Sequence, residues 1–182
     1  MTAFEFPVGI CLLGLLGVAA GSDLHSRRIP NWLILAGLTL ALAVQWRLHG
    51  AAQGYASWGL GLLTGGGLFF PLYLLRGMGA GDVKLMAMVG GFVGPDLAFQ
   101  IVLVTCAIGG IWALAVVVSR RAWKSAGNNV LAIVLSKAGR SGSLFEAEEG
   151  AAHASVGSLP YGVAIALGTL SIMFLRAGQS IV

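Results

Sequence analysis

Two acidic side chains stand at the edges of apolar segments and are the first candidates for chemistry. Asp82 follows three glycines in RGMGAGDVKLMAM, residues 76–88, and Asp23 ends an earlier apolar run in AAGSDLHSRRIPNW. The chain has only seven acidic residues in 182. An ionisable group in or near the hydrocarbon of a membrane is costly, and its presence there points to function.

Two carboxylates that approach closely can share one proton and titrate as a pair. One carboxylate then takes a proton from water while the other protonates the substrate carbonyl, which is aspartyl peptidase chemistry. Two simpler interpretations remain open here. Asp82 is also suited to capping a helix N-terminus, and Asp23 is also suited to pairing with Arg27 or Arg28.

The glycines beside Asp82 fit a site that receives a peptide. Gly77, Gly79 and Gly81 remove side chains there, which permits unusual backbone angles and close approach by an extended substrate. Lys84 follows Asp82 by two positions. It is suited to lowering the pKa of Asp82, to binding substrate backbone, or to reaching the cytoplasmic headgroups.

Composition indicates an integral membrane protein. The chain is 57% hydrophobic and 10% charged, with a mean hydropathy of +0.87, whereas soluble domains carry about 25% charged residues. The formal charge of +4 does not indicate nucleic-acid binding, because the basic residues sit in short gaps between apolar runs. Cys11 and Cys106 form no CxxC pair, so neither a metal site nor a cofactor is expected.

The apolar runs predict an all-α, polytopic membrane protein with a single membrane domain over residues 1–182, and the two aspartates suggest that this domain is a peptidase. No basic segment precedes the first run, so we expect it to be a retained helix rather than a signal peptide. The loop 119–158 is expected in the cytoplasm, and the fourth helix is short for a span of about 20 residues. The six expected transmembrane helices are about 5–22, 31–46, 57–75, 83–95, 97–118 and 159–176.

The basic residues then predict the orientation. Alternating sides divide the eleven Lys and Arg residues into nine on one side and two, Arg47 and Arg176, on the other. The positive-inside rule puts the larger group in the cytoplasm and both termini outside. Asp23 and Asp82 are 59 positions apart, yet this topology places both at one depth on the cytoplasmic side.

Three motifs in the same order resemble the prepilin and preflagellin peptidases, a family of intramembrane aspartyl proteases. GAGDVKL, from Gly79 to Leu85, is similar to the family's G-x-G-D motif. DLHSRRIPN, from Asp23 to Asn31, resembles its first motif, and LPYG, from Leu159 to Gly162, resembles the motif that opens its last helix. The resemblance implies that Asp23 and Asp82 are the catalytic pair.

The resemblance also implies a substrate and a location. The family removes the basic leader from type IV pilin-like precursors at the cytoplasmic face of the bacterial inner membrane. The chain lacks the N-terminal region with paired cysteines that long forms use for N-methylation. It is similar to the short form of tight-adherence (Flp) pili, the CpaA/TadV type, so we expect cleavage without methylation. The expected partners are the prepilin or pseudopilin precursor and the lipid bilayer.

The remaining motif residues are interpreted mainly as shaping the site. Pro30 restricts the entry to the second helix, and Asn31 is suited to capping its first turn. Pro160 suits a helix start, and Tyr161 is placed to hydrogen-bond near the site. The residues expected to bind substrate or shape the site are Gly79, Gly81, Lys84, Pro30, Asn31, Pro160, Tyr161 and Gly162.

Two other functions fit the same residues. A small proton-coupled transporter or channel would use the carboxylates as ion-binding groups, although no inverted repeat is evident. A non-enzymatic assembly subunit would need neither aspartate. The acidic cluster Glu146, Glu148 and Glu149 is interpreted either as a solvated loop or as a patch that attracts basic leaders.

Overall fold

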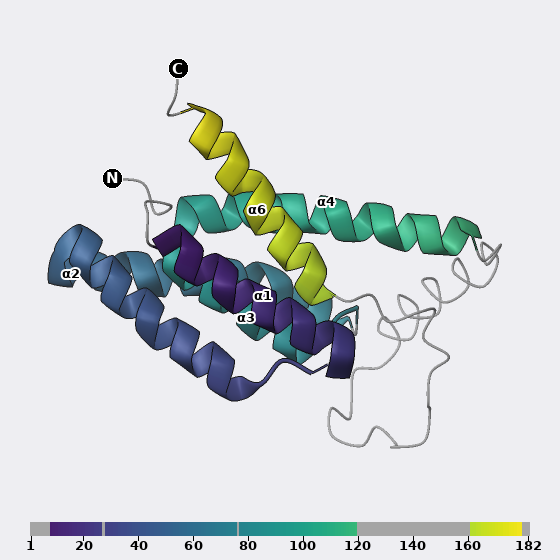
Figure 1. Cartoon of the computed structure of the whole chain (residues 1–182), viewed down its shortest axis with the longest axis horizontal. Helices are drawn as coiled ribbons and strands as arrows, with labels where there is room; N and C mark the ends of the chain where they lie inside the picture. The colour runs from purple at the N-terminus through teal and green to yellow at the C-terminus, as the bar shows by residue number, and fades with distance from the viewer. Residues whose placement is uncertain (1–7, 27, 76, 120–160, 180–182) are drawn as a thin grey trace, which may run out of the picture. The chain divides into compact units, whose positions relative to one another are not determined.

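The computed structural model describes residues 8–26, 28–75, 77–119 and 161–179, and the described residues form helices and short connections with no strand. By its contacts the chain divides into two units, Met1–Gly109 with Pro160–Val182, and Gly110–Leu159. The helices are α1 (Val8–Ser26), α2 (Asn31–Leu74), α3 (Ala80–Val93), α4 (Pro95–Ser119) and α6 (Tyr161–Gln179) (Figure 1). The all-α prediction is confirmed.

Within the described residues, four helices are long and apolar enough to cross a membrane, as expected of a multi-pass membrane protein. The four stretches are Gly9–Ser26, Asn31–Leu74, Pro95–Ala115 and Tyr161–Gly178. The count of six spans, the orientation of the termini and the single-domain assignment stay predictions. All six expected segments overlap helical residues. The second and third overlap the same helix, α2.

The helix α2 contains a sharp break at Gly50. Gly50 has φ 77° and ψ 177°, a conformation that residues with a side chain rarely adopt. The second arm then packs back against the first, because the indole N–H of Trp58 donates to the carbonyl of Leu38 at 3.2 Å. The residues between the second and third expected segments are helical on both sides of Gly50.

Glycines bring the backbones of α2 and α3 together. A Cβ added at Gly61 would overlap the carbonyl of Gly90, and a Cβ added at Gly90 would overlap the carbonyl of Gly61. One turn further along, a Cβ at Gly65 would overlap the carbonyl of Met86. Small residues allow such close helix packing inside a membrane, where dispersion between close-packed backbones stabilises the contact.

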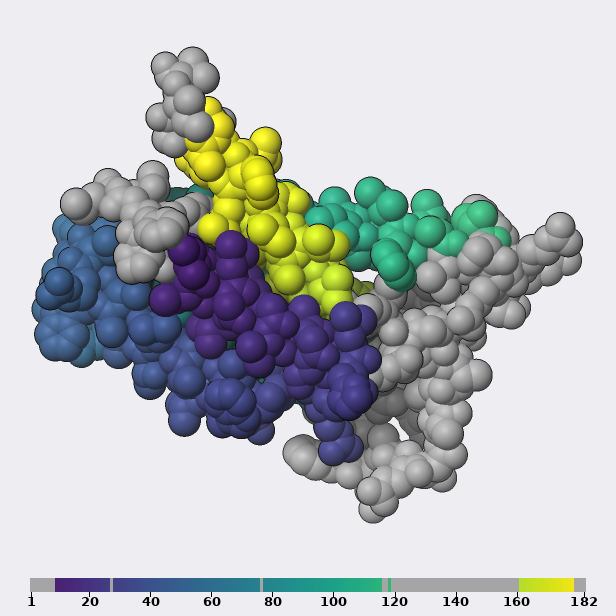
Figure 2. Space-filling model, in the orientation of Figure 1, coloured from purple at the N-terminus to yellow at the C-terminus, as the bar shows by residue number. Residues whose placement is uncertain are grey.

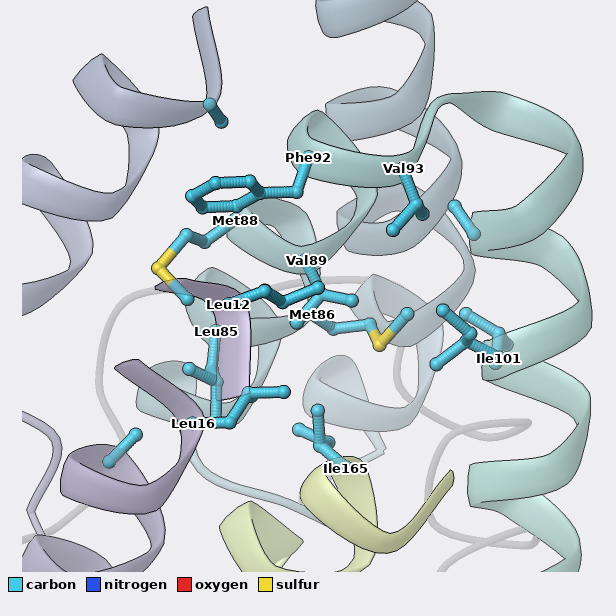
Figure 3. Close-up of a cluster of buried hydrophobic side chains, with 14 of the residues drawn as sticks. Leu12, Leu16, Leu85, Met86, Met88, Val89, Phe92, Val93, Ile101 and Ile165 are labelled. Atoms are coloured by element: carbon cyan, nitrogen blue, oxygen red, sulfur yellow. The ribbon is translucent and has the colours of Figure 1, made fainter. Parts of the chain in front are cut away.

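The short helix α3 is buried at the centre of the core. Leu85, Met86, Met88, Val89 and Phe92 are all 0% exposed, and they meet Leu12 and Leu16 of α1, Ile101 of α4 and Ile165 of α6 (Figure 3). A helix that is apolar all round is expected to be buried rather than to sit on the surface. Its 14 residues therefore form a central helix that is surrounded by longer helices and carries Asp82 in its first turn.

Polar contacts identify the two ends of this bundle. At one end, Lys84 contacts Asn31 and the amide of Gly162 contacts Asp23. At the other end, the Gln45 amide donates to the carbonyl of Phe92 at 2.9 Å, and Arg176 donates to Gln100 at 3.3 Å. Both aspartates therefore lie at the same end. The space-filling view shows α1, α2 and α6 forming the near face (Figure 2).

The close contact between α2 and α3 predicts that alanine substitutions at Gly61 and Gly59 change the free energy of unfolding in opposite directions. Gly61→Ala forces a methyl group into the backbone of Gly90, so we expect it to lower the free energy of unfolding by about 1–3 kcal/mol. Thermal unfolding in detergent, followed by circular dichroism, measures the change.

Gly59→Ala is the matched control in the same arm of α2. A Cβ at Gly59 meets nothing within 4 Å, and replacing glycine by alanine inside a helix stabilises it by roughly 0.5–1 kcal/mol. If Gly61→Ala unfolded at the same temperature as Gly59→Ala or at a higher one, the backbone contact between α2 and α3 at Gly61 would be contradicted.

Candidate active site

Asp23 lies near the end of α1, just before a connection that hydroxyl groups hold in place. The Ser22 hydroxyl donates to the carbonyl of Arg28 at 2.8 Å, and the Ser26 hydroxyl donates to the carbonyl of Ser22 at 2.8 Å. The first of these bonds ties the end of α1 to the connection that leads to α2, and the second lies within the last turns of α1. They fix the direction in which the last turn of α1 presents Asp23, whose side chain is half-buried.

The start of α2 differs from the sequence interpretation in one detail. Pro30 is the N-cap residue, with φ −65° and ψ 132°, and the cap has no side-chain hydrogen bond. The prediction that Asn31 caps the helix is therefore wrong. Its side-chain oxygen instead accepts a hydrogen bond from the Lys84 ammonium group at 3.1 Å. This bond ties the first turn of α2 to the first turns of α3.

The glycine motif forms the N-terminus of α3 around Asp82. Gly79 is the N-cap residue, and its amide donates to Asp82 Oδ2 at 3.1 Å, while the amide of Asp82 donates to the carbonyl of Gly79 at 3.2 Å. Asp82 occupies the third helical position, so the alternative that it is the N-cap is wrong. Its side chain reaches back to the cap in the manner of a capping box.

The glycines in this motif save space rather than adopt unusual angles. Gly79 has φ −78° and ψ 153°, which other residues also adopt, and the positive φ values recorded in the described chain belong to Gly50 and Gly94. A Cβ at Gly79 would lie 3.3 Å from Asp82 Oδ2, and one at Gly81 would lie 3.5 Å from Ile29. The α1–α2 connection therefore rests directly against the motif that carries Asp82.

The first turn of α6 reaches the carboxylate of Asp23. The Gly162 amide donates to Asp23 Oδ2 at 3.0 Å, and a Cβ at Gly162 would lie 2.9 Å from that oxygen. Tyr161, one position earlier, is half-buried and interacts electrostatically with Asp82. The start of α6 thus touches one aspartate through its backbone and interacts with the other through a side chain.

Electrostatics couple the two aspartates. Burial raises the pKa of Asp82 from 3.8 to about 6, the Gly79 amide lowers it in part, and the negative charge of Asp23 raises it further. Asp82 lies outside the four candidate spans and is 8% exposed. Two carboxylates that interact electrostatically, with the pKa of one raised to about 6, are suited to sharing a proton.

The comparison with known families identifies the family of the segment that contains both aspartates. Residues 10–114 match the type IV leader peptidase family. The chain belongs to the type IV leader peptidase family. The match includes α1, α2, α3 and most of α4, with both Asp23 and Asp82 inside it. No curated protein and no solved structure matches the chain.

Type IV leader peptidases act on prepilins, so membership in the family makes this chain a peptidase and implies a prepilin substrate. The match ends before α6. The placement of Tyr161 and Gly162 beside the aspartates therefore rests on the structure alone. Pro160 lies outside the described residues, and so does the acidic cluster at Glu146, Glu148 and Glu149.

The structure adds residues that the sequence interpretation did not single out. Ser22 and Ser26 hold the α1–α2 connection, and Ile29 packs against Gly81. Ser22 and Ser26 flank Asp23 in the sequence, and short hydroxyl side chains often bond to nearby backbone. That signal was available in the motif. The contact of Ile29 with Gly81 depends on tertiary packing and had no local signal.

Proposed function

We propose that this chain is an aspartic endopeptidase that removes the leader peptide from type IV prepilins with Asp23 and Asp82 as its catalytic pair. The observation that carries the proposal is the electrostatic coupling of Asp82 to Asp23 across two helices. Each carboxylate is also oriented by a backbone amide, from Gly79 for Asp82 and from Gly162 for Asp23.

The chemistry follows from two carboxylates that share one proton. The ionised member deprotonates a water molecule, which attacks the carbonyl carbon of the scissile bond, and the protonated member gives its proton to the carbonyl oxygen. Amides from Gly79 and Gly162 keep each carboxylate in one orientation. Such fixed geometry contributes to catalysis because the reacting groups need not be reoriented in each cycle.

We place the site at the cytoplasmic face of the bacterial inner membrane. Lys84 and Arg28 lie at the end of the bundle that holds the aspartates, while Arg47 and Arg176 belong to the opposite side of the predicted topology. The strong excess of Lys and Arg on the aspartate side supports a cytoplasmic location. The leader of a prepilin is exposed on that side before export.

We further propose a substrate of the tight-adherence (Flp) type and cleavage without N-methylation. The three motifs follow the short-form pattern, and the 182 residues contain no CxxC pair. Cys11 and Cys106 lie in separate helices, α1 and α4. The chain therefore offers no paired cysteines of the kind that accompany methylation in the long forms.

The test is cleavage of a candidate prepilin by the purified protein in detergent or vesicles, with the new N-terminus identified by mass spectrometry. We expect one cut after the basic leader and no added methyl group when a methyl donor is supplied. A protein that moves protons or ions across vesicles, yet leaves the precursors of its own genome intact, would contradict the proposal and support the transporter alternative.

A further inference from the structure

The two aspartates have different surroundings, and the difference assigns their roles. Asp23 is half-buried at the end of α1, whereas Asp82 is 8% exposed in the first turn of the buried helix α3. This inference rests on the aspartic mechanism proposed above and goes one step further. That mechanism needs one carboxylate with a proton and one without, and it leaves open which is which.

The Asp23 carboxylate accepts a hydrogen bond from the start of α6. Its Oδ2 accepts the Gly162 amide at 3.0 Å, in the first turn of a 19-residue helix. A backbone N–H stabilises the charged form of a carboxylate, and the positive end of a helix dipole adds to this effect. The start of α6 lies close to this side chain, because a Cβ added at Gly162 would lie 2.9 Å from Asp23 Oδ2.

Burial and a neighbouring negative charge shift Asp82 toward its neutral form. Its side chain is buried, and the charge that acts on it across the helices is that of Asp23 from α1. The Lys84 ammonium group, two positions later in α3, is bonded to Asn31, and Tyr161 of α6 interacts electrostatically with Asp82. The Gly79 amide favours the anion, but burial is the larger influence and raises the pKa of Asp82 to about 6.

We propose that Asp82 carries the catalytic proton and acts as the general acid, while Asp23 stays ionised and acts as the general base. Asp82 Oδ2 is occupied by the Gly79 amide, which leaves Oδ1 to hold the proton. Asp23 Oδ2 is likewise occupied by the Gly162 amide, which leaves Oδ1 to accept a proton from water.

The resulting steps balance in atoms and charge. Asp23 removes a proton from water as the water oxygen bonds to the carbonyl carbon, and Asp82 gives its proton to the carbonyl oxygen, which forms a neutral gem-diol. Asp23 then gives its proton to the leaving nitrogen as the carbon–nitrogen bond breaks. One diol hydroxyl returns its proton to Asp82. The products are a carboxylic acid and an amine, and both aspartates regain their starting states.

A pair of substitutions at Gly79 tests this assignment by the direction of a pH shift. Gly79→Pro removes the amide that donates to Asp82, and the backbone there, at φ −78°, suits proline. Gly79→Ala adds the same Cβ beside Asp82 Oδ2 but keeps the amide. The pH profile of prepilin cleavage by the purified protein is measured for both variants and for the wild type.

Loss of the amide raises the pKa of Asp82, because the donor stabilises the charged form. If Asp82 must be protonated, the alkaline limb of the Gly79→Pro profile moves up by about half to one pH unit relative to Gly79→Ala. An acidic limb that moves up instead, or limbs that both stay in place, would overturn the assignment. Absence of cleavage by the wild type at every pH would refute the proposed function itself, which is a distinct result.

Infrared spectroscopy provides a second test that does not depend on the folding of the proline variant. The wild type is titrated between about pH 5 and about pH 8, across the pKa of a buried carboxyl group. We expect a protonated carboxyl band that disappears near pH 6, is missing in Asp82→Asn and remains in Asp23→Asn. A band that is missing in Asp23→Asn and remains in Asp82→Asn would overturn the assignment.

Discussion

Replacing Asp82 with asparagine is expected to reduce the rate of prepilin cleavage by about 100- to 10,000-fold, which is the range for removing a general acid or base. Asparagine has nearly the same size and still accepts the Gly79 amide through its side-chain oxygen, but it supplies no transferable proton. Processing in membranes, followed by the size of the precursor on an immunoblot, measures the loss.

Asp96→Asn is the matched control for this substitution. Asp96 also lies in the first turn of a helix, α4, and its side chain is exposed. We expect Asp96→Asn to cleave at the wild-type rate, and both variants to reach the same abundance in the membrane. Wild-type processing by Asp82→Asn at equal abundance would remove Asp82 from the catalytic pair.

Replacing Gly162 with alanine is expected to reduce cleavage by about 10- to 100-fold, because displacement of a catalytic group by about 1 Å can cost this much. A Cβ at Gly162 would lie 2.9 Å from Asp23 Oδ2 and 3.1 Å from the Asp23 Cβ. The Asp23 side chain or the start of α6 must therefore shift. The effect is expected mainly in kcat, measured with a purified precursor.

Gly178→Ala controls for the added methyl group in the same helix. A Cβ at Gly178 meets nothing within 4 Å, so we expect cleavage at the wild-type rate. Equal activity in Gly162→Ala and Gly178→Ala would show that α6 does not position Asp23.

The sequence alone was enough to predict an all-helical membrane protein with Asp23 and Asp82 at one end. Apolar runs determine which segments enter a bilayer, and the Lys and Arg residues between them indicate the side. These are local properties of the chain. The chain's match to the type IV leader peptidase family and the shared end of the bundle agree with that prediction.

The contacts that orient the two aspartates were not all predictable. Gly79 is three residues from Asp82, and a helix N-terminus with a side chain that reaches back to it is a local arrangement. Gly162 is 139 positions from Asp23, so its contact depends on how α6 packs against α1. The motif around Gly162 indicated that the residue mattered, while the partner of its amide required the structure.

One local prediction failed because a tertiary contact overrode local preference. Asn31 is well suited to cap a helix, but the Lys84 ammonium group binds its side-chain oxygen.

The central claim is that carboxylates from two helices that are far apart in the sequence act together on one peptide bond. It is tested most directly by Asp23→Asn. Purified Asp23→Asn and Asp82→Asn are compared with the wild type in single-turnover cleavage of one precursor, after circular dichroism has confirmed that all three are folded. We expect both variants to lose cleavage to the same background rate. Wild-type cleavage by folded Asp23→Asn would contradict the claim.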